Sequence, residues 1–421
     1  MNFHDVYNNL RESRYKKQLK IIKKIIYFPI SLIEFFFKIL VAFIFYIFLV
    51  LLRPFITIRI GELESRAIGH FTLPVEIFLS EKDSGITSSY RSIDLFYFNK
   101  KICNKFIARK WAGYFHICPR FLIETLHHYL IDTKKENRHL APYRHWKMTK
   151  KWQNFDINNV LTKSKIHLKF SESEIISGNL ILDEVGLKDK KIIAFHARDS
   201  SYREGRNAKA GFRDSNINNY YMGVNTVVKA GYCAVRIGRV VNGQIFDPNR
   251  VIFDYAVSDY ASDFMDTYLL SKIHLLVCSG SGIESLALCF RKPLVCVNLA
   301  EWVTLHLYNP DQYLLFIPKK FYWIENKLPL SMKKIIELNV NRITTEEELI
   351  KAGIFAEENS KEEINDVILE ALEMLNGNHS YSSDDLKLQD AFIKSAGLYE
   401  GNALKIPVGM QFLKNNLYLL D

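Results

Sequence analysis

The sequence lacks the signatures of several common protein classes. Its six cysteines form no C-x-x-C pair, which argues against a structural metal site and against a disulfide framework. No Walker A motif occurs, and no G-x-G-x-x-G fingerprint follows the relevant strand, so a kinase or simple dehydrogenase is disfavoured. No Asp-x-Asp occurs, which removes the metal–diphosphate clamp of one sugar-transfer fold. No RNP-type basic-aromatic signature points to nucleic acid. We therefore expect no metal and no cofactor.

What the chain does contain is typical of a globular protein. It has 421 residues, 48% of them hydrophobic and 24% charged, which is enough for two or three domains. The net charge of +10 is uneven: residues 1–55 carry +6, residues 344–421 carry −9, and the middle therefore carries +13. A basic middle suits an anionic ligand or a membrane surface.

The N-terminal segment combines basic and apolar residues. Residues 11–24 hold seven Lys/Arg against one acid, and Ile39 to Leu52 is an unbroken run of fourteen apolar residues. Three alternatives are open: a membrane-embedded or re-entrant helix, an interfacial amphipathic helix, and a helix buried in a soluble core. We favour a monotopic or re-entrant segment at the cytoplasmic face, because basic residues suit anionic lipid head groups there.

Alternation of strands and helices predicts an α/β protein with parallel sheets. The expected divisions are a membrane-associated segment (1–54), an N-terminal Rossmann-like domain (55–185), a C-terminal Rossmann-like domain (186–343) and an acidic helical region (344–421). In the first domain we expect strands at 55–60, ended by Gly61, and at 95–98, with helices at 68–80 and 104–130, the last broken near Pro119. In the second domain we expect strands at 191–196, 232–237, 251–253, 274–278 and 294–297.

The stretch from Ile273 to Asn298 predicts a strand, a turn at Ser279–Gly282, a helix and a second strand. Gly280 and Gly282 would let the backbone approach a ligand closely, Ser279 and Ser281 add hydroxyl donors, and the helix start adds unpaired N–H groups. This is an expected phosphate site, with Glu284 placed to accept hydrogen bonds from a ribose. The alternative is a tight strand–helix turn with no ligand.

Other predicted strands deliver charged side chains to similar carboxyl ends, where open α/β sheets bind ligands. These residues are His196, Arg198 and Arg213, or Arg236 and Arg239. Arginine pairs well with phosphate oxygens. The alternative for each is a solvated surface position.

Five blocks of sequence in this order resemble a family of bacterial glycosyltransferases of surface-carbohydrate loci. The blocks are RIGELESRAIGH (59–70), FHARDSSY (195–202), FRDSNI (212–217), FDYAVSDYASDFMDTYLLSK (253–272) and CSGSGIESLALCFRKPLVCVN (278–298). The family is similar to GT-B enzymes, with two Rossmann-like domains facing a cleft, and the resemblance covers roughly residues 55–330.

The resemblance implies that Ser279–Gly282 bind the diphosphate of a nucleotide sugar and that Glu284 binds its ribose. It implies that Arg198 and Arg213 neutralise the leaving diphosphate, with the acceptor entering near Gly61–His70. Candidates for the catalytic base are His70, Glu62 and His196. Each histidine has the alternative of a purely structural role. Cys278 is expected to be a small packing residue, close enough to the site for thiol modification to inhibit.

The expected function is metal-independent, hexosyltransferase-type transfer of a sugar from a nucleotide-sugar donor to a surface-glycan or lipid-linked acceptor. One rival is a nucleotide-sugar epimerase or hydrolase of related fold, which would need no acceptor. Another is a non-catalytic binding protein of a glycan assembly complex. The sequence leaves the sugar, the nucleotide and the acceptor open.

Overall fold

A computed structural model describes most of the chain. The described residues are 29, 36–37, 39–87, 91–132, 138–141, 156, 158–199, 201, 211–300, 302, 313–396 and 406–421. The basic stretch at 11–24 lies outside them, so the prediction for this segment stays a prediction.

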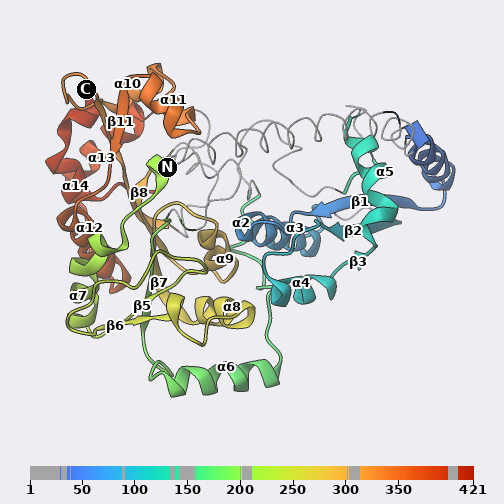
Figure 1. Cartoon of the computed structure of the whole chain (residues 1–421), viewed down its shortest axis with the longest axis horizontal. Helices are drawn as coiled ribbons and strands as arrows, with labels where there is room; N and C mark the ends of the chain where they lie inside the picture. Colours follow the sequence, from blue (N-terminus) through green and yellow to red (C-terminus); the bar gives the residue numbers. More distant parts are fainter. Residues whose placement is uncertain are drawn as a thin grey trace, which may run out of the picture. The chain divides into compact units, whose positions relative to one another are not determined.

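The chain forms two compact units (Figure 1). The first comprises Met1–Leu63, Ser89–Phe98 and Phe115–Pro142, and the second comprises Glu64–Ser88, Asn99–Tyr114 and Tyr143–Asp421. The chain therefore passes between the units several times, which differs from the single junction expected near residue 186. Each unit contains a parallel β-sheet, as the alternation of elements predicted.

The first unit is built on three parallel strands. Across the sheet they are β1 (Thr57–Leu63), β2 (Ser92–Phe98) and β3 (His116–Ile117). Helix α5 (Arg120–Asp132) packs against β1 and β2. The predicted strands at 55–60 and 95–98 are confirmed, and β3 occupies the break predicted near Pro119.

The prediction that Gly61 ends the first strand is wrong. Gly61 lies inside β1, directly opposite Phe96 of β2. A Cβ atom at Gly61 would lie 2.4 Å from the Phe96 ring. Glycine therefore serves close packing at this position, which is one of its roles inside a strand.

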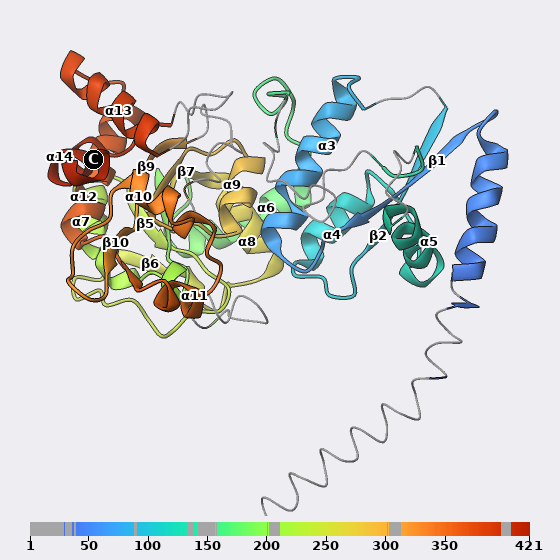
Figure 2. The ribbon, with the colours of Figure 1, turned by 90° about the horizontal axis from the view of Figure 1, so that it is seen from above.

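A helix over residues 36–37 and 39–52, here called the N-terminal helix, belongs to the first unit (Figure 2, blue). Its buried residues Ala42 and Leu49 join a core cluster with Ile60, Tyr97, Leu126 and Leu130, and Tyr46 packs against that cluster. In the part of the chain that the structure describes, no helix is both long and apolar enough to cross a membrane.

The second unit is built on six parallel strands. In spatial order they are β6 (Ile252–Asp254), β5 (Cys233–Arg236), β4 (Ile192–His196), β7 (Ile273–Cys278), β8 (Leu294–Leu299) and β9 (Tyr313–Pro318). The chain starts in the middle at β4, moves outward to β6, and restarts beside β4 with β7. This is the doubly wound order 3-2-1-4-5-6, in which the direction of winding reverses between β4 and β7.

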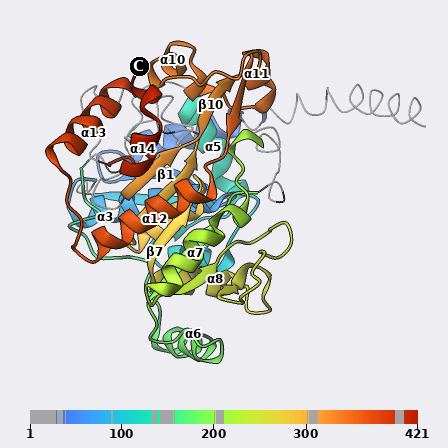
Figure 3. The same ribbon diagram turned by 90° about the vertical axis from the view of Figure 1, so that its left-hand side faces the viewer.

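Helices cover both faces of this sheet (Figures 1 and 3). Helices α7 (Tyr221–Lys229) and α12 (Lys361–Leu375) lie side by side on one face, and α8 (Asp263–Lys272) and α9 (Ile283–Cys289) cover the other. A Cβ atom at Gly223 of α7 would lie 2.3 Å from Ile368 of α12, so these two helices pack at close range. Helix α6 (Glu172–Glu184) packs on α8. The sheet is thus buried on both sides, as an all-parallel sheet requires.

Three short helices before residue 115 also belong to the second unit. They are α2 (Ile68–Phe71), α3 (Leu73–Asp83) and α4 (Lys105–Ala112). Helices α2 and α3 pack on α9, and α4 packs on α8. The helix predicted at 68–80 is confirmed, but it breaks at Thr72, whose hydroxyl donates to the carbonyl of Ile68. Pro74 then sits in the first turn of α3.

A buried ion pair joins α3 to the end of α9. The fully buried Glu76 carboxylate accepts from Arg291 Nη2 at 2.9 Å. It also faces Nδ1 of His167 at 3.3 Å, and Nε2 of that ring lies 3.1 Å from Asp83. Burial lowers the pKa of His167, but the hydrogen bonds and charges of Glu76 and Asp83 outweigh it, so the pKa is raised.

The C-terminal region packs on the same unit. It contains α10 (Met332–Glu337), α11 (Glu346–Lys351), α12, α13 (Ser383–Ser395) and α14 (Met410–Asn415), together with the antiparallel strands β10 (Lys320–Trp323) and β11 (Ile354–Glu357). Helices α11 and α12 each begin with a capping box. The side chains of Thr345 and Ser360 accept from the backbone N–H three residues on, and the Glu side chain at that position accepts from the backbone N–H of the capping residue.

Candidate functional site

Part of the predicted site, namely His196, Arg198 and the Ser279–Gly282 turn, comes together where β4 and β7 end, at the reversal point of the sheet. The backbone N–H of Arg198 donates to Ser279 Oγ at 2.8 Å, and Ser281 Oγ lies 3.2 Å from His196 Nδ1. Because β4 and β7 are neighbouring parallel strands, their carboxyl ends deliver these residues to one edge. Open α/β sheets bind ligands at this kind of point.

The turn that follows β7 is shaped by two glycines. Gly280 has φ +66°, a conformation that side chains with a Cβ rarely adopt. Gly282 meets Gly69 of α2 at close range, since a Cβ atom on Gly282 would lie 2.9 Å from the Gly69 nitrogen. The structure therefore brings the sequence block that ends at His70 next to the turn, although the two are separated by some two hundred residues.

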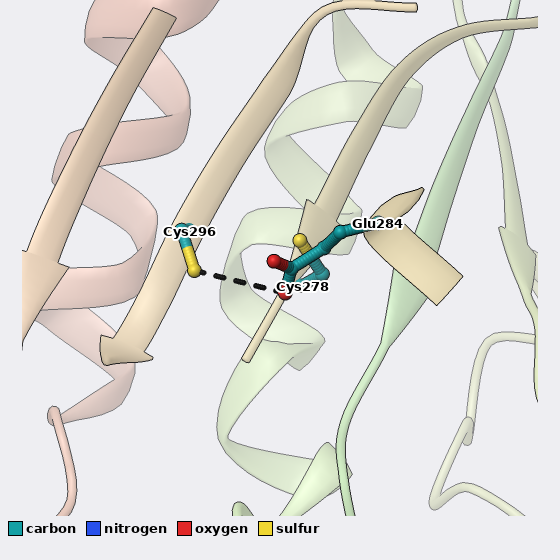
Figure 4. Close-up of side chains that lie close together, drawn as sticks. All are labelled: Cys278, Glu284 and Cys296. Carbon is teal, nitrogen blue, oxygen red and sulfur yellow. Dashed lines mark hydrogen bonds between the residues drawn. The ribbon is translucent and has the colours of Figure 1, made fainter. Parts of the chain in front are cut away.

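Glu284 points into the protein (Figure 4). Its Oε1 accepts the backbone N–H of Ser281 at 2.7 Å and the thiol of Cys296 at 3.9 Å, and Glu284 is only 5% exposed. The Glu284 carboxylate thus already binds the backbone N–H of Ser281, which lies in the turn predicted to bind phosphate. The ribose contact predicted for Glu284 stays a prediction, and in this structure the side chain fixes the shape of the turn.

Glu284 shares its position with two buried thiols. Cys278 and Cys296 are directly paired in β7 and β8, and the ligand atoms of all three residues lie within 4.8 Å of one another. Among the described residues, this is the one group close enough to share a metal ion. Burial raises the pKa of Cys278 well above its usual range. The hydrogen bond with Cys278 lowers the pKa of Cys296, but burial and the Glu284 charge outweigh it. Metal ligation needs thiolates, whereas this environment favours neutral thiols.

Alkylation of the folded protein should separate the exposed from the buried thiols. Cys118 and Cys233 are partly exposed and should be labelled first. Cys103 should react slowly, because burial raises its pKa to about 12 and thiolate is the reactive form. Peptide mass spectrometry should find label at Cys278, Cys289 and Cys296 only after denaturation. Labelling of Cys278 as fast as Cys233 would contradict the packing role given to it here.

Arg198 lies beside the segment that carries Arg213. The guanidinium Nε of Arg198 is 3.6 Å from Asp214 Oδ1, and the Arg198 carbonyl accepts from the backbone N–H of Ser215 at 2.7 Å. Arg213 is the last residue of the short helix η3 (Gly211–Arg213). Both predicted arginines therefore reach the same edge of the sheet, one of them paired with a carboxylate.

The two other candidate arginines have structural partners. Arg236 is buried and donates to Asp254 at 3.0 Å and to the carbonyl of Gly243. Arg239 pairs with Asp266 at 2.7 Å, and also with Asp263. Arg236 is therefore not the solvated surface residue given as the alternative, and both arginines have ion-pair partners within the protein.

His196 is neutral in this environment. Burial lowers its pKa to about 4; Asp199 opposes the shift, while the charges of Arg236 and Arg198 add to it. A neutral imidazole at physiological pH can accept a proton, although a pKa this low makes it a weak base. Its Nδ1 atom lies within hydrogen-bond distance of the Ser281 hydroxyl in the turn.

The pH dependence of the free energy of unfolding should reveal the lowered pKa of His196. A folded-state pKa below the free value of 6.5 means that the unfolded chain binds the proton more readily. His196 therefore contributes stability that is present above pH 6.5 and is lost as pH falls toward about 4. A His196→Gln variant should lose less stability than the parent across that range in urea unfolding. Equal losses in the two proteins would contradict the assigned shift.

Lys319 lies at the same edge of the sheet and was not predicted from the sequence. It follows β9, is only 3% exposed, and donates from Nζ to the carbonyl of Asp214 at 2.7 Å. Its backbone N–H binds the carbonyl of Leu299 at the end of β8. Burial lowers the pKa of Lys319 to about 8, with Glu358 and Glu346 opposing.

A buried amide clasp holds this part of the edge. Asn298 and Asn359 exchange backbone-to-side-chain hydrogen bonds of 2.6 Å in both directions. Asn298 also donates to Ser215 Oγ at 2.8 Å, and Asn359 donates to the Pro318 carbonyl. Asn298 has φ +53°, which asparagine tolerates better than most residues. The clasp joins the ends of β8 and β9 to the segment that carries Asp214.

The remaining two candidates for a catalytic base lie on different units. His70 is half-buried in α2, beside the turn. Glu62 was predicted to follow the first strand, but it lies within β1, is buried, and pairs in register with Tyr97. Glu62 belongs to the first unit and the other two candidates belong to the second. Their catalytic roles stay predictions.

Comparisons with known proteins found similar solved structures but no similar sequence. No family model and no curated protein matches the sequence. Solved structures similar to it include a glycosyl transferase of family 9 from Veillonella parvula, at 12% identity over 76% of this chain and 97% of that one, with a TM-score of 0.42.

Two further solved structures have lower scores. The E. coli ADP-heptose lipopolysaccharide heptosyltransferase II has 10% identity over 70% of this chain and 98% of that one, with a TM-score of 0.34. A UDP-GlcNAc 2-epimerase from Neisseria meningitidis has 12% identity over 76% and 99%, with a TM-score of 0.29. Glycosyltransferases are thus among the structures that the chain is similar to, as the sequence blocks predicted. At these scores, function must be argued from the chain's own residues.

Proposed function

We propose that this protein is a glycosyltransferase that moves a sugar from a nucleotide-sugar donor to a surface-glycan or lipid-linked acceptor. The observation that carries the proposal is the convergence of His196, Arg198 and Ser281 at the reversal point of the six-stranded sheet. A 3-2-1-4-5-6 sheet binds nucleotides at this point. Hexosyl transfer, independence of metal and a place at the cytoplasmic face of the membrane belong to the same proposal.

The donor diphosphate would lie over the Ser279–Gly282 turn. Arg198 and Lys319 supply positive charge on either side of Asp214, and Ser281 supplies a hydroxyl. Charge that develops on the leaving diphosphate would be stabilised by these fixed cations, which is the usual largest contribution to such reactions. The candidates for the base that takes the proton of the acceptor hydroxyl are His196, whose imidazole is neutral, His70 and Glu62. Only partial removal of this proton is needed as the sugar transfers.

A ligand screen with a turnover assay tests the proposal. Nucleoside diphosphates and nucleotide sugars should raise the melting temperature of the full-length protein, and the best donor should lose its sugar to an acceptor glycan even with a chelator present. An Arg250→Ala variant, changed at an exposed arginine, serves as the charge-matched control for Arg198→Ala. Release of free sugar or its epimer without acceptor would replace the proposal with an epimerase or hydrolase. Binding without turnover on any acceptor would favour a non-catalytic binding protein.

Replacing Lys319 with methionine should separate binding from stability. A buried cation with a lowered pKa costs the folded state free energy at neutral pH, so the variant should be as stable as the parent, within about 1 kcal/mol, or more stable. Its affinity for a nucleoside diphosphate should fall about tenfold, the value of one charge-assisted hydrogen bond. The parent alone should gain stability as pH rises from about 8 to 10.5. A destabilised variant with unchanged affinity would make Lys319 purely structural.

A further inference from the structure

The N-terminal helix touches the rest of the first unit along a narrow stripe. Ala42, Tyr46 and Leu49 form it, at the spacing of residues that share one face of a helix. Tyr46 lies 6.0 Å from the Tyr129 ring of α5, centre to centre. The stripe ties the helix firmly to the core of the unit and leaves the greater part of its circumference uncovered.

The uncovered part is apolar throughout. No polar side chain occurs between Ile39 and Leu52 except the Tyr46 hydroxyl. The exposed large side chains are Phe36, Phe37, Ile39, Leu40, Phe43, Ile44, Phe45, Ile47, Phe48 and Leu51, and Phe55 follows just after the helix. Soluble monomers rarely leave a continuous apolar patch of this kind in water. The expectation of a helix buried in a soluble core is therefore wrong for this face.

The charge around the helix identifies what covers it. No Asp or Glu occurs between Glu34 and Glu62. Arg53 and Arg91 are both exposed near its carboxyl end, where the Arg91 carbonyl binds the backbone N–H of Thr57. Upstream in the sequence, residues 11–24 add seven Lys/Arg against one acid. The covering surface should thus be apolar inside and anionic at its edge, which describes a bilayer with acidic head groups.

The length of the helix decides how it would enter. From residue 36 to residue 52 the helix spans about 26 Å at the α-helical rise, and its unbroken apolar run 39–52 spans about 21 Å, whereas the hydrocarbon core is about 30 Å thick. An ordinary interfacial helix turns a polar face to water. In this helix the side that would face water is instead the stripe covered by the first unit. The helix would therefore lie flat beneath the head groups, with the unit resting above it.

We propose that the N-terminal helix is a monotopic membrane anchor that inserts its exposed face into one leaflet containing anionic lipid. The inference rests on exposure, charge and length alone, and it holds whether or not the second unit transfers sugar. Of the three alternatives that the sequence left open, the proposal selects a helix embedded in the membrane. One face of this helix lies in lipid, and the other packs on the first unit.

Sedimentation with vesicles tests the anchor. The full-length protein should pellet with phosphatidylcholine vesicles that contain phosphatidylglycerol, and should pellet less with phosphatidylcholine alone or at high salt. A Phe48→Ser, Leu51→Ser double variant, changed at side chains 55% and 68% exposed, should bind about 100-fold more weakly. The matched control is Leu180→Ser with Leu386→Ser, at 64% and 56% exposed positions of the second unit, which should bind like the parent.

A photo-crosslinking amino acid at position 48 distinguishes lipid from a second copy of the chain. The expected product is a protein–lipid adduct, with no adduct when the same group stands at position 386. A protein–protein crosslink at position 48, together with a dimer that dissociates in the double variant, would overturn the proposal. So would a parent protein that stays in the supernatant with both kinds of vesicle. Thermal shift by nucleoside diphosphates should be the same in parent and double variant, so failure of the anchor and failure of the donor site are separable.

Discussion

Replacing Arg198 with alanine should weaken the binding of a nucleoside diphosphate by about 10- to 100-fold, since a hydrogen bond to a charged group is worth about 1.5–3 kcal/mol. The guanidinium stands at the end of β4, its backbone bonded to Ser279 of the turn. Its side chain is mostly buried, so its charge acts with little screening by solvent. Isothermal titration would measure the change.

Removing the neighbouring carboxylate of Asp214 should have the opposite effect on the affinity for a nucleoside diphosphate. Asp214 lies 3.6 Å from Arg198 and would compete with a diphosphate for it. Asp214→Asn should therefore leave the affinity for a nucleoside diphosphate unchanged or raise it a few-fold. The affinity of an Arg198→Lys variant should lie between those of the parent and the alanine variant, because lysine keeps the charge but loses the planar guanidinium. If Arg198→Ala binds as well as Arg250→Ala, the diphosphate does not lie at this edge. If Asp214→Asn binds much more weakly, Asp214 supports the ligand instead of competing with it.

Removing the carboxylate of Glu76 should have the largest effect on stability. Glu76→Ala would leave Arg291 without its partner and take an acceptor from His167. Breaking one partner of a buried ion pair costs about 3–5 kcal/mol, because the other charge stays desolvated. Since Arg291 keeps contacts to the carbonyls of Leu161 and Cys289 and is partly exposed, the lower end of that range applies.

An exposed pair in α11 supplies the control for this experiment. Glu347 and Lys351 lie 2.8 Å apart with both side chains in solvent, and Glu347→Ala should change stability by about 0.5 kcal/mol or less. Urea unfolding of the parent and both variants measures the contrast. The buried site also has a pH signature: the raised pKa of His167 contributes stability below pH 6.5 that is lost as pH rises through its folded value. Equal effects of the two substitutions would mean that the Glu76 site is relaxed or hydrated.

Local patterns in the sequence were sufficient to predict much of the secondary structure of the second unit. Five of the six sheet strands were predicted, because each is a short run of mostly apolar residues that can be recognised without knowledge of its neighbours in the sheet. The Ser279–Gly282 turn is confirmed for the same reason, because glycine at positive φ leaves a direct trace in the sequence. Its placement beside Arg198 followed from the rule that parallel strands share a carboxyl edge.

Contacts between distant residues account for what was missed. Strand β9 was not predicted, because a short apolar run between polar segments fits a buried helix as well as a strand. Lys319 could not be recognised without it. The Asn298–Asn359 clasp joins residues 61 apart, each ordinary in its own context. Gly61 looked like a strand end because the ring that requires it, Phe96, is far away in the sequence. The contacts of Glu284 with the Ser281 N–H and the Cys296 thiol were not predicted either, and its ribose contact stays a prediction.

The pairing of α7 with α12 has a consequence for synthesis on the ribosome. Gly223 and Ile368 pack at close range although some 145 residues separate them, so α12 is part of the cover of the central sheet. While the ribosome is still adding residues beyond β9, the face that α12 will cover is open to solvent or to a chaperone. The second unit therefore cannot complete its fold strand by strand as it emerges. It must wait until α12 has left the exit tunnel, and a chain stalled before residue 361 should be recognised by the cell as misfolded.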